Sequence, residues 1–404
     1  MLSLTGRPDG EPLGAPRALV DGVRAWAGEL ARLSAELGVP VVVDPLALLA
    51  QRAAVAGLVR AGDVSCGGGS RLLACADGWV AASLARPADW EAVAAWLGRP
   101  RPVAEGDWAG VAAGVAGIGA DELRAGAELL GLPVAVLGER QWRRDPGGPP
   151  HSPGAIHGVE VRRIGSAAAA RSCTDLTVVD LSSLWAGPLA GRLLARAGAR
   201  VVKVESTTRP DGARRGSPRF FRLLNAGKDS VALDFRTAEG RRHLAGIVAQ
   251  ADVVITGARP RALQQLGLDL ETMVAHGRPR IWLSVTGYGA ATGSGHRVAF
   301  GDDAAVAGGL VAFDDRGPCF LGDAIADPLC GLASAVALLT AVGLDGSWVI
   351  DASMADIAGG LTGPAFPVAG LRPSPPPDPG DEWGAVTPAF GADTGAVLAG
   401  LAPA

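Results

Sequence analysis

The sequence lacks the residue patterns that mark disulfide-rich and metal-binding proteins. Its 404 residues include five cysteines, at positions 66, 75, 173, 319 and 330, and no two of them form a Cys-x-x-Cys pair. The five histidines are scattered and have no metal-ligand spacing with these cysteines. The sequence therefore predicts neither a disulfide framework nor a metal site, and such thiols are typical of reduced, cytoplasmic proteins.

Long apolar runs and an excess of positive charge are missing as well. No window reaches about 18 uninterrupted apolar residues, and the N-terminus has no charged leader before an apolar run, so we expect neither a membrane span nor a secretory signal. The formal net charge is −4. Arginines cluster at 209–222, but the chain has no overall basic footprint, so we do not expect nucleic acid as a partner.

The usual nucleotide-binding and serine-hydrolase motifs are absent or incomplete. There is no P-loop and no Gly-x-Ser-x-Gly turn between a strand and a helix. The segment 180–191 followed by 201–205 imitates a dinucleotide fingerprint, but it has only Gly187 and Gly191 and lacks Gly-x-Gly. An NAD-dependent oxidoreductase is therefore a weak alternative.

The first 150 residues mix helices with short strands. Their 3.6-residue apolar periodicity predicts helices, and an Asp-Gly bend at 77–78 predicts a strand–turn–strand unit. The expected helices cover 16–37, 45–60, 87–97, 108–115 and 120–130, and the expected strands cover 41–43, 72–75, 79–84 and 131–136. A run rich in Pro, Gly and Arg then extends over 140–170, with one short strand at 159–164.

From residue 175 the pattern changes to alternating strands and helices, which indicates a parallel sheet covered by helices. The expected strands are 176–181, 199–205, 230–234, 253–255, 281–285 and 346–352, and the expected helices are 188–197, 238–251, 260–275, 328–342, 354–361 and 391–401. We therefore predict a small α+β domain (1–150), a linker (151–173), a Rossmann-like large domain (174–370), and a proline-rich linker with a C-terminal helix (371–404).

One helix start stands out in the large domain. Asp327 occupies an expected N-cap position and Pro328 the first helical position, ahead of apolar residues at helical spacing. This places a carboxylate beside free backbone N–H groups, as a capping aspartate or as a reactive group.

Seven segments, in order and at consistent spacing, resemble the large domain of family III CoA-transferases, the superfamily of formyl-CoA transferases, carnitine CoA-transferases and acyl-CoA racemases. They are 180–191, 198–205, 224–234, 251–254, 266–268, 284–289 and 326–332. In that family the acid of an Asp-x-x-x-Gly helix start is the catalytic nucleophile, and Asp327 with Gly331 matches it. Residues 67–69, 76–79, 90 and 131–134 resemble the family's small domain, which here precedes the large-domain strands instead of following them.

The resemblance implies transfer of CoA between an acyl-CoA and a carboxylic acid, with CoA as substrate and no permanently bound cofactor. A carboxylate can attack a thioester to give a mixed anhydride and then an enzyme–CoA thioester, and the N–H groups of Gly67, Gly68 and Gly69 are suitable donors to the oxyanion. Lys228 is the best-matched cation for CoA phosphates, with Arg209 and Arg259, and then Arg214 and Arg222, as helpers. The family also implies a homodimer.

The sequence departs from the family pattern in ways that keep two alternatives open. Gly257 and Ala258 replace an Asn-Phe pair that contacts CoA in relatives, which favours a catalytically lapsed CoA-binding homologue. A racemase is the other alternative. His296 lies several residues before the Gly-His-Asp position of racemases, where this chain has Gly301, Asp302 and Asp303.

Overall fold

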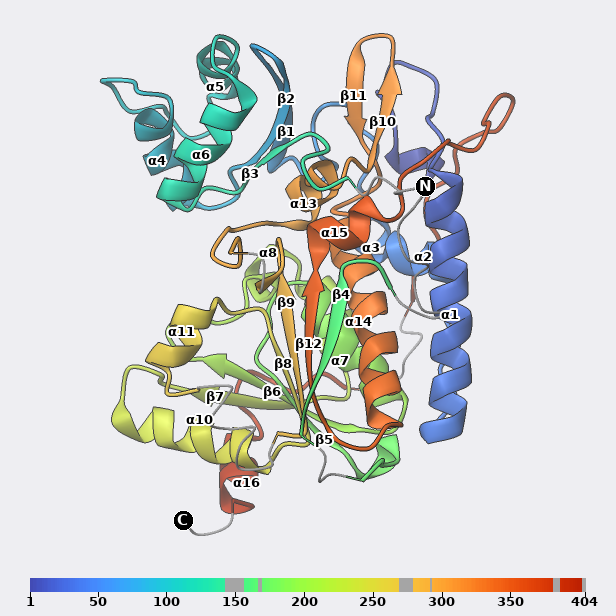
Figure 1. Ribbon diagram of the computed structural model, residues 1–404, viewed down its shortest axis with the longest axis vertical. Coiled ribbons are helices and arrows are strands. Elements are labelled where there is room, and N and C mark those ends of the chain that lie inside the picture. Colours follow the sequence, from blue (N-terminus) through green and yellow to red (C-terminus); the bar gives the residue numbers. More distant parts are fainter. Residues whose placement is uncertain (142–155, 166–168, 269–278, 291–292, 381–385, 402–404) are drawn as a thin grey trace.

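The computed structural model describes residues 1–141, 156–165, 169–268, 279–290, 293–380 and 386–401. Its centre is a seven-stranded sheet in the order β4-β12-β9-β8-β5-β6-β7 (Figure 1). The strands are β4 (Val159–Gly165), β5 (Thr177–Asp180), β6 (Arg200–Ser206), β7 (Asp229–Leu233), β8 (Val253–Thr256), β9 (Ile281–Thr286) and β12 (Ser347–Ser353). All neighbours pair in parallel except β4 with β12. Ignoring β4, the parallel strands have the order 3-2-1-4-5-6, so the predicted Rossmann-like fold is confirmed.

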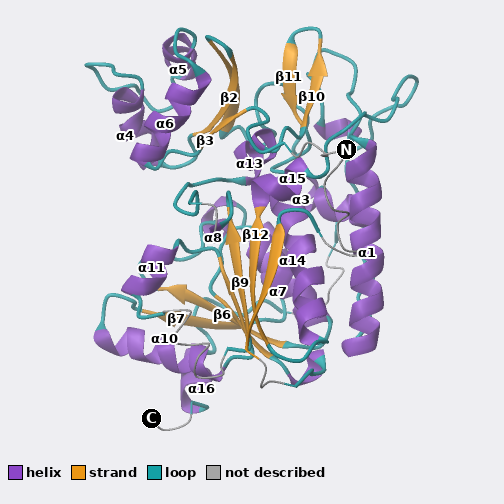
Figure 2. Ribbon diagram, viewed as in Figure 1, coloured by secondary structure: helices purple, strands orange, loops and turns teal. Residues whose placement is uncertain are grey.

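Helices cover both faces of this sheet (Figure 2). The face beneath Ile281, Leu283 and Ile350 packs against α1, α7 and α14, and the face beneath Val254 and Trp282 packs against α10, α11 and α16. The helices are α1 (Arg17–Leu37), α7 (Ala186–Arg196), α10 (Ala238–Gln250), α11 (Pro260–Gln265), α14 (Ala326–Val342) and α16 (Thr394–Ala399). The strands are buried on both sides, which explains why their sequences are continuous apolar runs.

A second, smaller core lies above the large sheet. It is built on the antiparallel sheet β1-β2-β3 and three helices, and Leu73, Trp90, Val111 and Leu123 belong to it. Its elements are β1 (Ser70–Cys75), β2 (Gly78–Ser83), α4 (Pro87–Trp96), α5 (Trp108–Val115), α6 (Ala120–Leu130) and β3 (Val134–Val136). The bend between β1 and β2 is the predicted one. We call residues 70–136 the small domain.

The first 69 residues do not join this small core, in contrast to the predicted division at residue 150. Helix α1 lies along α14, and its Leu19, Val23 and Leu30 belong to the core of the large domain. Two short helices, α2 (Pro45–Leu49) and α3 (Gln51–Ala56), follow and replace the single expected helix at 45–60. The N-terminal segment is therefore part of the large domain in space, although the two are far apart in sequence.

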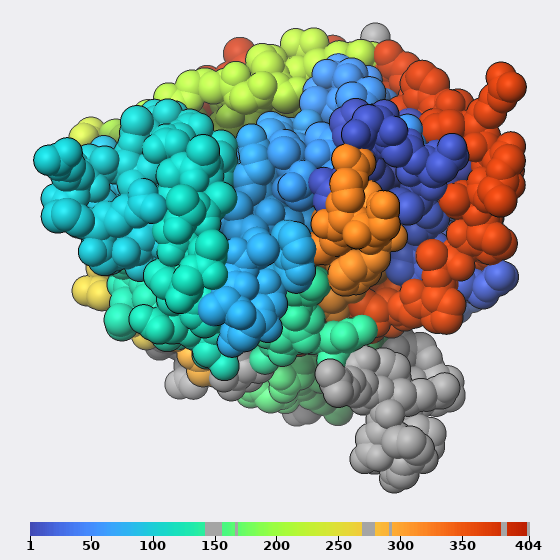
Figure 3. Space-filling model, turned by 90° about the horizontal axis from the view of Figure 1, so that it is seen from above, coloured from blue at the N-terminus to red at the C-terminus, as the bar shows by residue number. Residues whose placement is uncertain are grey.

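The remaining elements lie beside these two cores. They are α8 (Ala213–Gly216), α9 (Pro218–Asn225), α13 (Gly301–Ala307), the hairpin β10 (Val311–Asp314) and β11 (Gly317–Phe320), and α15 (Met354–Gly359). Helix α13 packs against β2 and β3 of the small domain and against α14 and α15 of the large domain. Seen from above, the small domain (cyan), the N-terminal segment (blue) and the hairpin (orange) share one face of the molecule (Figure 3).

Two sequence-based expectations are wrong or fall outside the described residues. The strand expected at 41–43 is absent because the N–H of Val41 donates to the side chain of Ser34 at 2.8 Å, and Val42 is exposed. The helix expected at 260–275 ends at Gln265 as α11, and residues 269–278 lie outside the described part. In the described part, no helix combines the length and apolar character needed to cross a bilayer.

Candidate active site

Asp327 lies in the first turn of α14, where the helix meets α7 and α13. The helix begins at Ala326 and its N-cap is Ile325, so Asp327 is the second helical residue and not the predicted N-cap. Free N–H groups and the positive end of the helix dipole still surround a carboxylate in this turn. Asp327 keeps partial solvent exposure, whereas most of its helix is buried.

Two glycines allow other backbone segments to approach this carboxylate closely. A Cβ on Gly331 would lie 2.8 Å from the carbonyl oxygen of Ala186, at the start of α7. Gly331 is one turn after Asp327, so it lets α7 lie against the same face of α14, and the Ala186 N–H donates to the Asp327 carboxylate. A Cβ on Gly301 would lie 2.3 Å from Asp327 Oδ2. The Asp-x-x-x-Gly spacing thus has a packing reason of its own.

The backbone before each of these helices is strained. Leu184, which precedes α7, and Ala324, which precedes α14, are non-glycine residues with positive φ, 70° and 42°. Such conformations cost of the order of 1–3 kcal/mol each and are retained where the surrounding structure fixes them. Hydrogen bonds fix both here, because the N–H of Leu184 donates to Asp211 and the N–H of Ala324 donates to Asp302.

Three further aspartates lie in the segments that meet near Asp327. Asp302 and Asp303 are in the first turn of α13, and Asp323 precedes α14. Small-domain hydroxyls bind two of them: Ser70 donates to Asp302 at 3.0 Å and Ser83 donates to Asp303 at 2.7 Å. These bonds tie the first residue of β1 and the last of β2 to the helix that faces Asp327.

The environment raises the pKa values of these carboxyls. Burial raises the pKa of Asp327 to about 7, and the negative charges of Asp302 and Asp323 add to the effect, while Arg52 and the Ala186 N–H oppose it. Burial also raises the pKa of Asp303 to about 7 and that of Asp302 above its ordinary value. At neutral pH, Asp327 is therefore present both as an acid and as a nucleophilic carboxylate.

Arg52, in α3, brings a positive charge to this group of acids. Its Nε and Nη2 donate to the two oxygens of Asp323 at 2.9 and 2.5 Å. The Asp323 side chain is fully buried. Sequence reasoning missed Arg52 because it is one of several arginines in an alanine-rich helical segment, and no motif singles it out.

The glycine loop, residues 67–69, lies beside the same group. A Cβ on Gly67 would contact Arg52 Nη2 at 3.3 Å, and the thiol of Cys66 donates to the carbonyl of Gly322 at 3.2 Å. Burial raises the pKa of that thiol to about 12, so Cys66 stays a neutral donor. The Gly68 N–H is used by the carbonyl of Ser65, at 2.8 Å. The Gly67 N–H makes no hydrogen bond within the described residues, so it is the better oxyanion donor of the two.

Lys228 lies elsewhere, and its placement argues against the predicted contact with CoA phosphates. The ammonium is buried and donates to Asp180 Oδ2, the carbonyl of Pro188 and Asn225 Oδ1 at 2.8, 2.8 and 3.0 Å. All three of its N–H groups are used, so none remains for a phosphate. Burial lowers the pKa of Lys228 to about 8, although Asp180 opposes the change. In this structure Lys228 forms a buried ion pair with Asp180, and its contact with CoA phosphates stays an untested prediction.

Of the four arginines predicted to help bind CoA, three are exposed to solvent and one forms an ion pair. Arg209, Arg222 and Arg259 are exposed. Arg214 pairs with Glu205 at 2.6 Å and lies over the ring of Phe221. Arg209 and Arg259 thus keep charged groups at the surface, on the loops after β6 and β8, at the carboxyl edge of the sheet where ligands of such folds bind.

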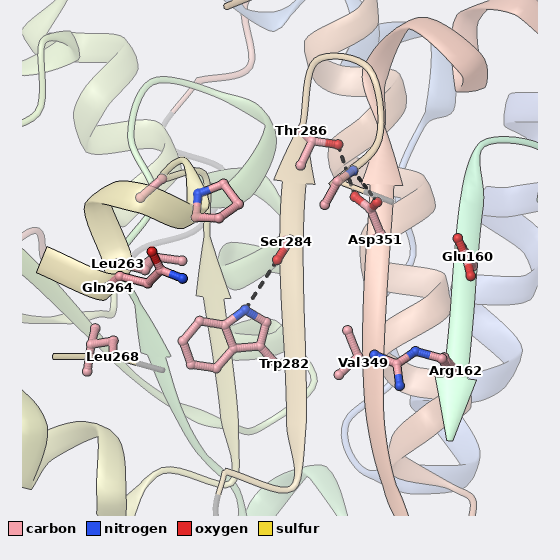
Figure 4. A pocket seen from close by; sticks show the side chains of 13 residues that line it. Glu160, Arg162, Leu263, Gln264, Leu268, Trp282, Ser284, Thr286, Val349 and Asp351 are labelled. Atoms are coloured by element: carbon pink, nitrogen blue, oxygen red, sulfur yellow. Dashed lines mark hydrogen bonds between the residues drawn. The ribbon is translucent and has the colours of Figure 1, made fainter. Parts of the chain in front are cut away.

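A cavity of about 480 Å³ lies on the other face of the sheet from α14 (Figure 4). Trp282, Ser284 and Asp351 line it from β9 and β12, and Leu263 and Gln264 line it from α11. These side chains belong to the sheet face opposite Asp327, so this cavity is not where Asp327 would react. The ring of His296 bonds a small-domain acid, Glu128 of α6, at 2.8 Å.

Metal ligation finds no support in the described part of the chain. No group of three or more His, Cys, Asp or Glu side chains is arranged there to hold a metal ion. The acids around Asp327 instead bond to Arg52, hydroxyls and backbone N–H groups.

Comparison with known proteins agrees with the large-domain resemblance. The model of CoA-transferase family III matches residues 174–395, which is more than half of the chain. Two curated relatives are succinyl-CoA–D-citramalate CoA-transferase of Chloroflexus aurantiacus, 32% identical over 182 residues, and succinate–glutarate CoA-transferase of Agrobacterium fabrum, 31% identical over 188 residues. The matches cover 43% and 42% of this chain and 45% and 46% of those proteins. The chain spans about half the length of the curated relatives it matches.

Solved structures give a similar partial match. A CAIB/BAIF family protein from Brucella suis is 33% identical, with a TM-score of 0.44, and the match covers 48% of this chain and 55% of that one. The N-terminal segment and the small domain precede residue 174, where the family model begins.

Proposed function

The chain belongs to CoA-transferase family III, and we propose that it transfers CoA between an acyl-CoA and a carboxylic acid, with Asp327 as the nucleophile. One observation carries this proposal. The Asp327 carboxylate lies where α14, α7 and α13 meet, with Arg52, Asp323 and the glycine loop beside it. A capping aspartate needs none of these surroundings.

The proposed reaction begins with the Asp327 carboxylate. One of its oxygens attacks the thioester carbonyl, the C–S bond breaks, and CoA leaves as a thiolate, which gives a mixed anhydride. The thiolate then attacks the Asp327 carbonyl, and the C–O bond of the anhydride breaks to release the donor acid as a carboxylate. The acceptor carboxylate repeats these steps in reverse order, so no proton or electron is gained or lost overall.

Two features of the site suit this chemistry. Each tetrahedral intermediate carries an oxyanion, and a backbone donor such as the Gly67 N–H contributes about 3 kcal/mol to its stabilisation in favourable cases. The desolvation that raises the pKa of Asp327 also keeps water scarce, which protects the anhydride from hydrolysis.

CoA enters as a substrate in this proposal, and no permanently bound cofactor is required. Arg259 and Arg209 are the residues that we assign to its phosphates, because they are exposed cations on loops at the carboxyl edge of the sheet. A homodimer and a cytoplasmic location remain predictions, the first from the family resemblance and the second from the free cysteines.

Replacement of the nucleophile tests the proposal. In the Asp327→Asn variant we expect exchange to be lost, and mass spectrometry after incubation with acyl-CoA should detect no CoA adduct, whereas the wild type carries one on the peptide with Asp327. Asp21→Asn is the control, since Asp21 is an exposed aspartate on α1. Unchanged exchange in the Asp327 variant would refute the proposal.

Absence of the adduct in the wild type would favour one of the two alternatives. A catalytically lapsed homologue would bind CoA but form no adduct and exchange no acid, and the replacement of the Asn-Phe pair by Gly257 and Ala258 favours this alternative. A racemase would invert an acyl-CoA stereocentre without adduct formation. The pairing of His296 with Glu128 speaks against this second alternative.

A further inference from the structure

We propose that Arg52 is the binding group for the carboxylate of the acid substrate, beside Asp327. This inference rests on the proposed function and adds a residue that lies well before the segment matched by the family model. Its starting point is a charge problem that the proposed reaction creates, because a second carboxylate must come within bonding distance of the Asp327 carbonyl.

Without a cation, the surroundings of Asp327 would repel that carboxylate. Asp302 and Asp323 act on Asp327 through their negative charges. Like charges in a desolvated site interact strongly, because few water molecules screen them. Arg52 is the cation with the largest effect on Asp327.

The geometry of Arg52 leaves part of its guanidinium available. Asp323 occupies Nε and Nη2, and within the described residues Nη1 has no hydrogen-bond partner. The Arg52 side chain is 30% exposed, whereas the Asp323 side chain is fully buried. Asp323 therefore binds the guanidinium through Nε and Nη2, and the N–H groups of Nη1 are left for an anion that reaches this partly exposed side chain.

The neighbours of Arg52 fix the plane of this group. Its guanidinium lies over the Trp185 ring, with 5.5 Å between the guanidinium carbon and the ring centroid. Gly67 lies against Nη2. Trp185 is the N-cap of α7, the helix whose Ala186 N–H donates to Asp327. An acid bound to Arg52 is thus held between the glycine loop and the start of α7, next to the nucleophile, without any need to reorganise the arginine.

The test uses a pair of substitutions that keeps the local net charge. Arg52→Met alone would leave the buried Asp323 without its partner, which endangers folding. The double variant Arg52→Met/Asp323→Asn removes one positive and one negative charge together. Asp323→Asn alone keeps the guanidinium and serves as the matched control, and Arg52→Lys keeps the charge but loses the fork of N–H groups.

The measurements separate acid binding from the earlier chemistry. At about pH 9, well above the pKa of Asp327 of about 7, we expect the double variant to form the CoA adduct from acyl-CoA with a KM within about threefold of the wild type. Its KM for the acceptor acid should rise about tenfold to a hundredfold, the size expected for one or two lost charge-assisted hydrogen bonds. The KM of Arg52→Lys for the acceptor acid should lie between those of the wild type and the double variant. Asp323→Asn should raise this KM less than about twofold.

Specific outcomes would overturn the inference. An unchanged KM for the acid in the double variant would do so, and so would an equal rise in Asp323→Asn alone, because the effect would then belong to Asp323. Failure of the proposed function looks different. In that case the wild type itself would carry no adduct, whatever residue stands at position 52.

Discussion

At the scale of single residues, the surroundings of Asp327 suit the nucleophilic role that we propose for it. A carboxylate in water is a weak nucleophile. Burial and two like charges hold the pKa of Asp327 at about 7, while Arg52 and the Ala186 N–H keep the ionised form accessible. The reactivity that we propose for Asp327 therefore comes from its neighbours on three different helices.

This balance predicts the pH dependence of the first half-reaction. Only the ionised carboxylate attacks a thioester, so adduct formation should be fastest above the pKa of Asp327 and should fall as the pH drops through about 7. The measurement is kcat/KM for adduct formation from pH 5.5 to 9. The charges of Asp302, Asp323 and Arg52 act on Asp327. The pH at which kcat/KM begins to fall is therefore a property of this group of residues and not of Asp327 alone.

Asp302→Asn provides the check on this assignment. Removal of the Asp302 charge takes away a cause of the raised pKa, so the break should move to lower pH. A rate that is flat from pH 5.5 to 9 in the wild type, or a break that moves upward in Asp302→Asn, would contradict the role given to these neighbours.

At the scale of elements, buried ion pairs fix the turn between β5 and α7. Lys228 bonds Asp180 at the end of β5 and the carbonyl of Pro188 in α7. Burial alone would raise the pKa of Asp180, but Lys228 and Lys203 outweigh it and the pKa falls to about 2. Because α7 supplies the Ala186 N–H, this pair supports the site from a distance.

Lys228→Met tests the structural role against the phosphate role that its sequence context suggests. We expect the free energy of unfolding to fall by about 3–5 kcal/mol, since the buried Asp180 would lose the cation that is hydrogen-bonded to it. The KM for acyl-CoA of the folded protein should be unchanged. Urea unfolding and initial-rate kinetics provide the two values, and Asp180→Asn/Lys228→Met should recover part of the loss. A large rise in the KM with little loss of stability would restore the phosphate role.

The elements also show what the sequence can and cannot predict. The parallel strands were predictable because their buried apolar runs alternate with helices. Asp327 became a candidate because its Asp-x-x-x-Gly motif resembles the family's, and its role stays a prediction. The start of α13 and the hairpin β10–β11 were missed, because short elements in glycine-rich sequence have little periodicity. Arg52 was missed for another reason. Its importance depends on a contact with Asp323 across 271 positions of the chain, and no local pattern encodes such a contact.

At the scale of the whole molecule, one chain supplies every part of the candidate site. The small domain precedes the large domain in sequence, and Ser70 and Ser83 tie it to α13 of the same chain. Helix α1 packs along α14, which places α3 and Arg52 near the start of that helix. All the side chains that we assign to the candidate site therefore belong to one chain.

Mixed oligomers can test this arrangement in solution. Two differently tagged chains, one with Asp327→Asn and one with Arg52→Met/Asp323→Asn, are co-expressed, and the species carrying both tags is purified. Arg52 and Asp327 lie in one chain in the structure. We therefore expect the mixed oligomer to exchange acids no faster than its double-variant chain does alone, at an acid concentration below the KM of the double variant. A site shared between subunits would instead leave one intact site in each mixed dimer. Recovery of exchange toward the wild-type rate in that species would therefore contradict the single-chain site, and the separately purified variants, mixed after purification, control for simple addition of their activities.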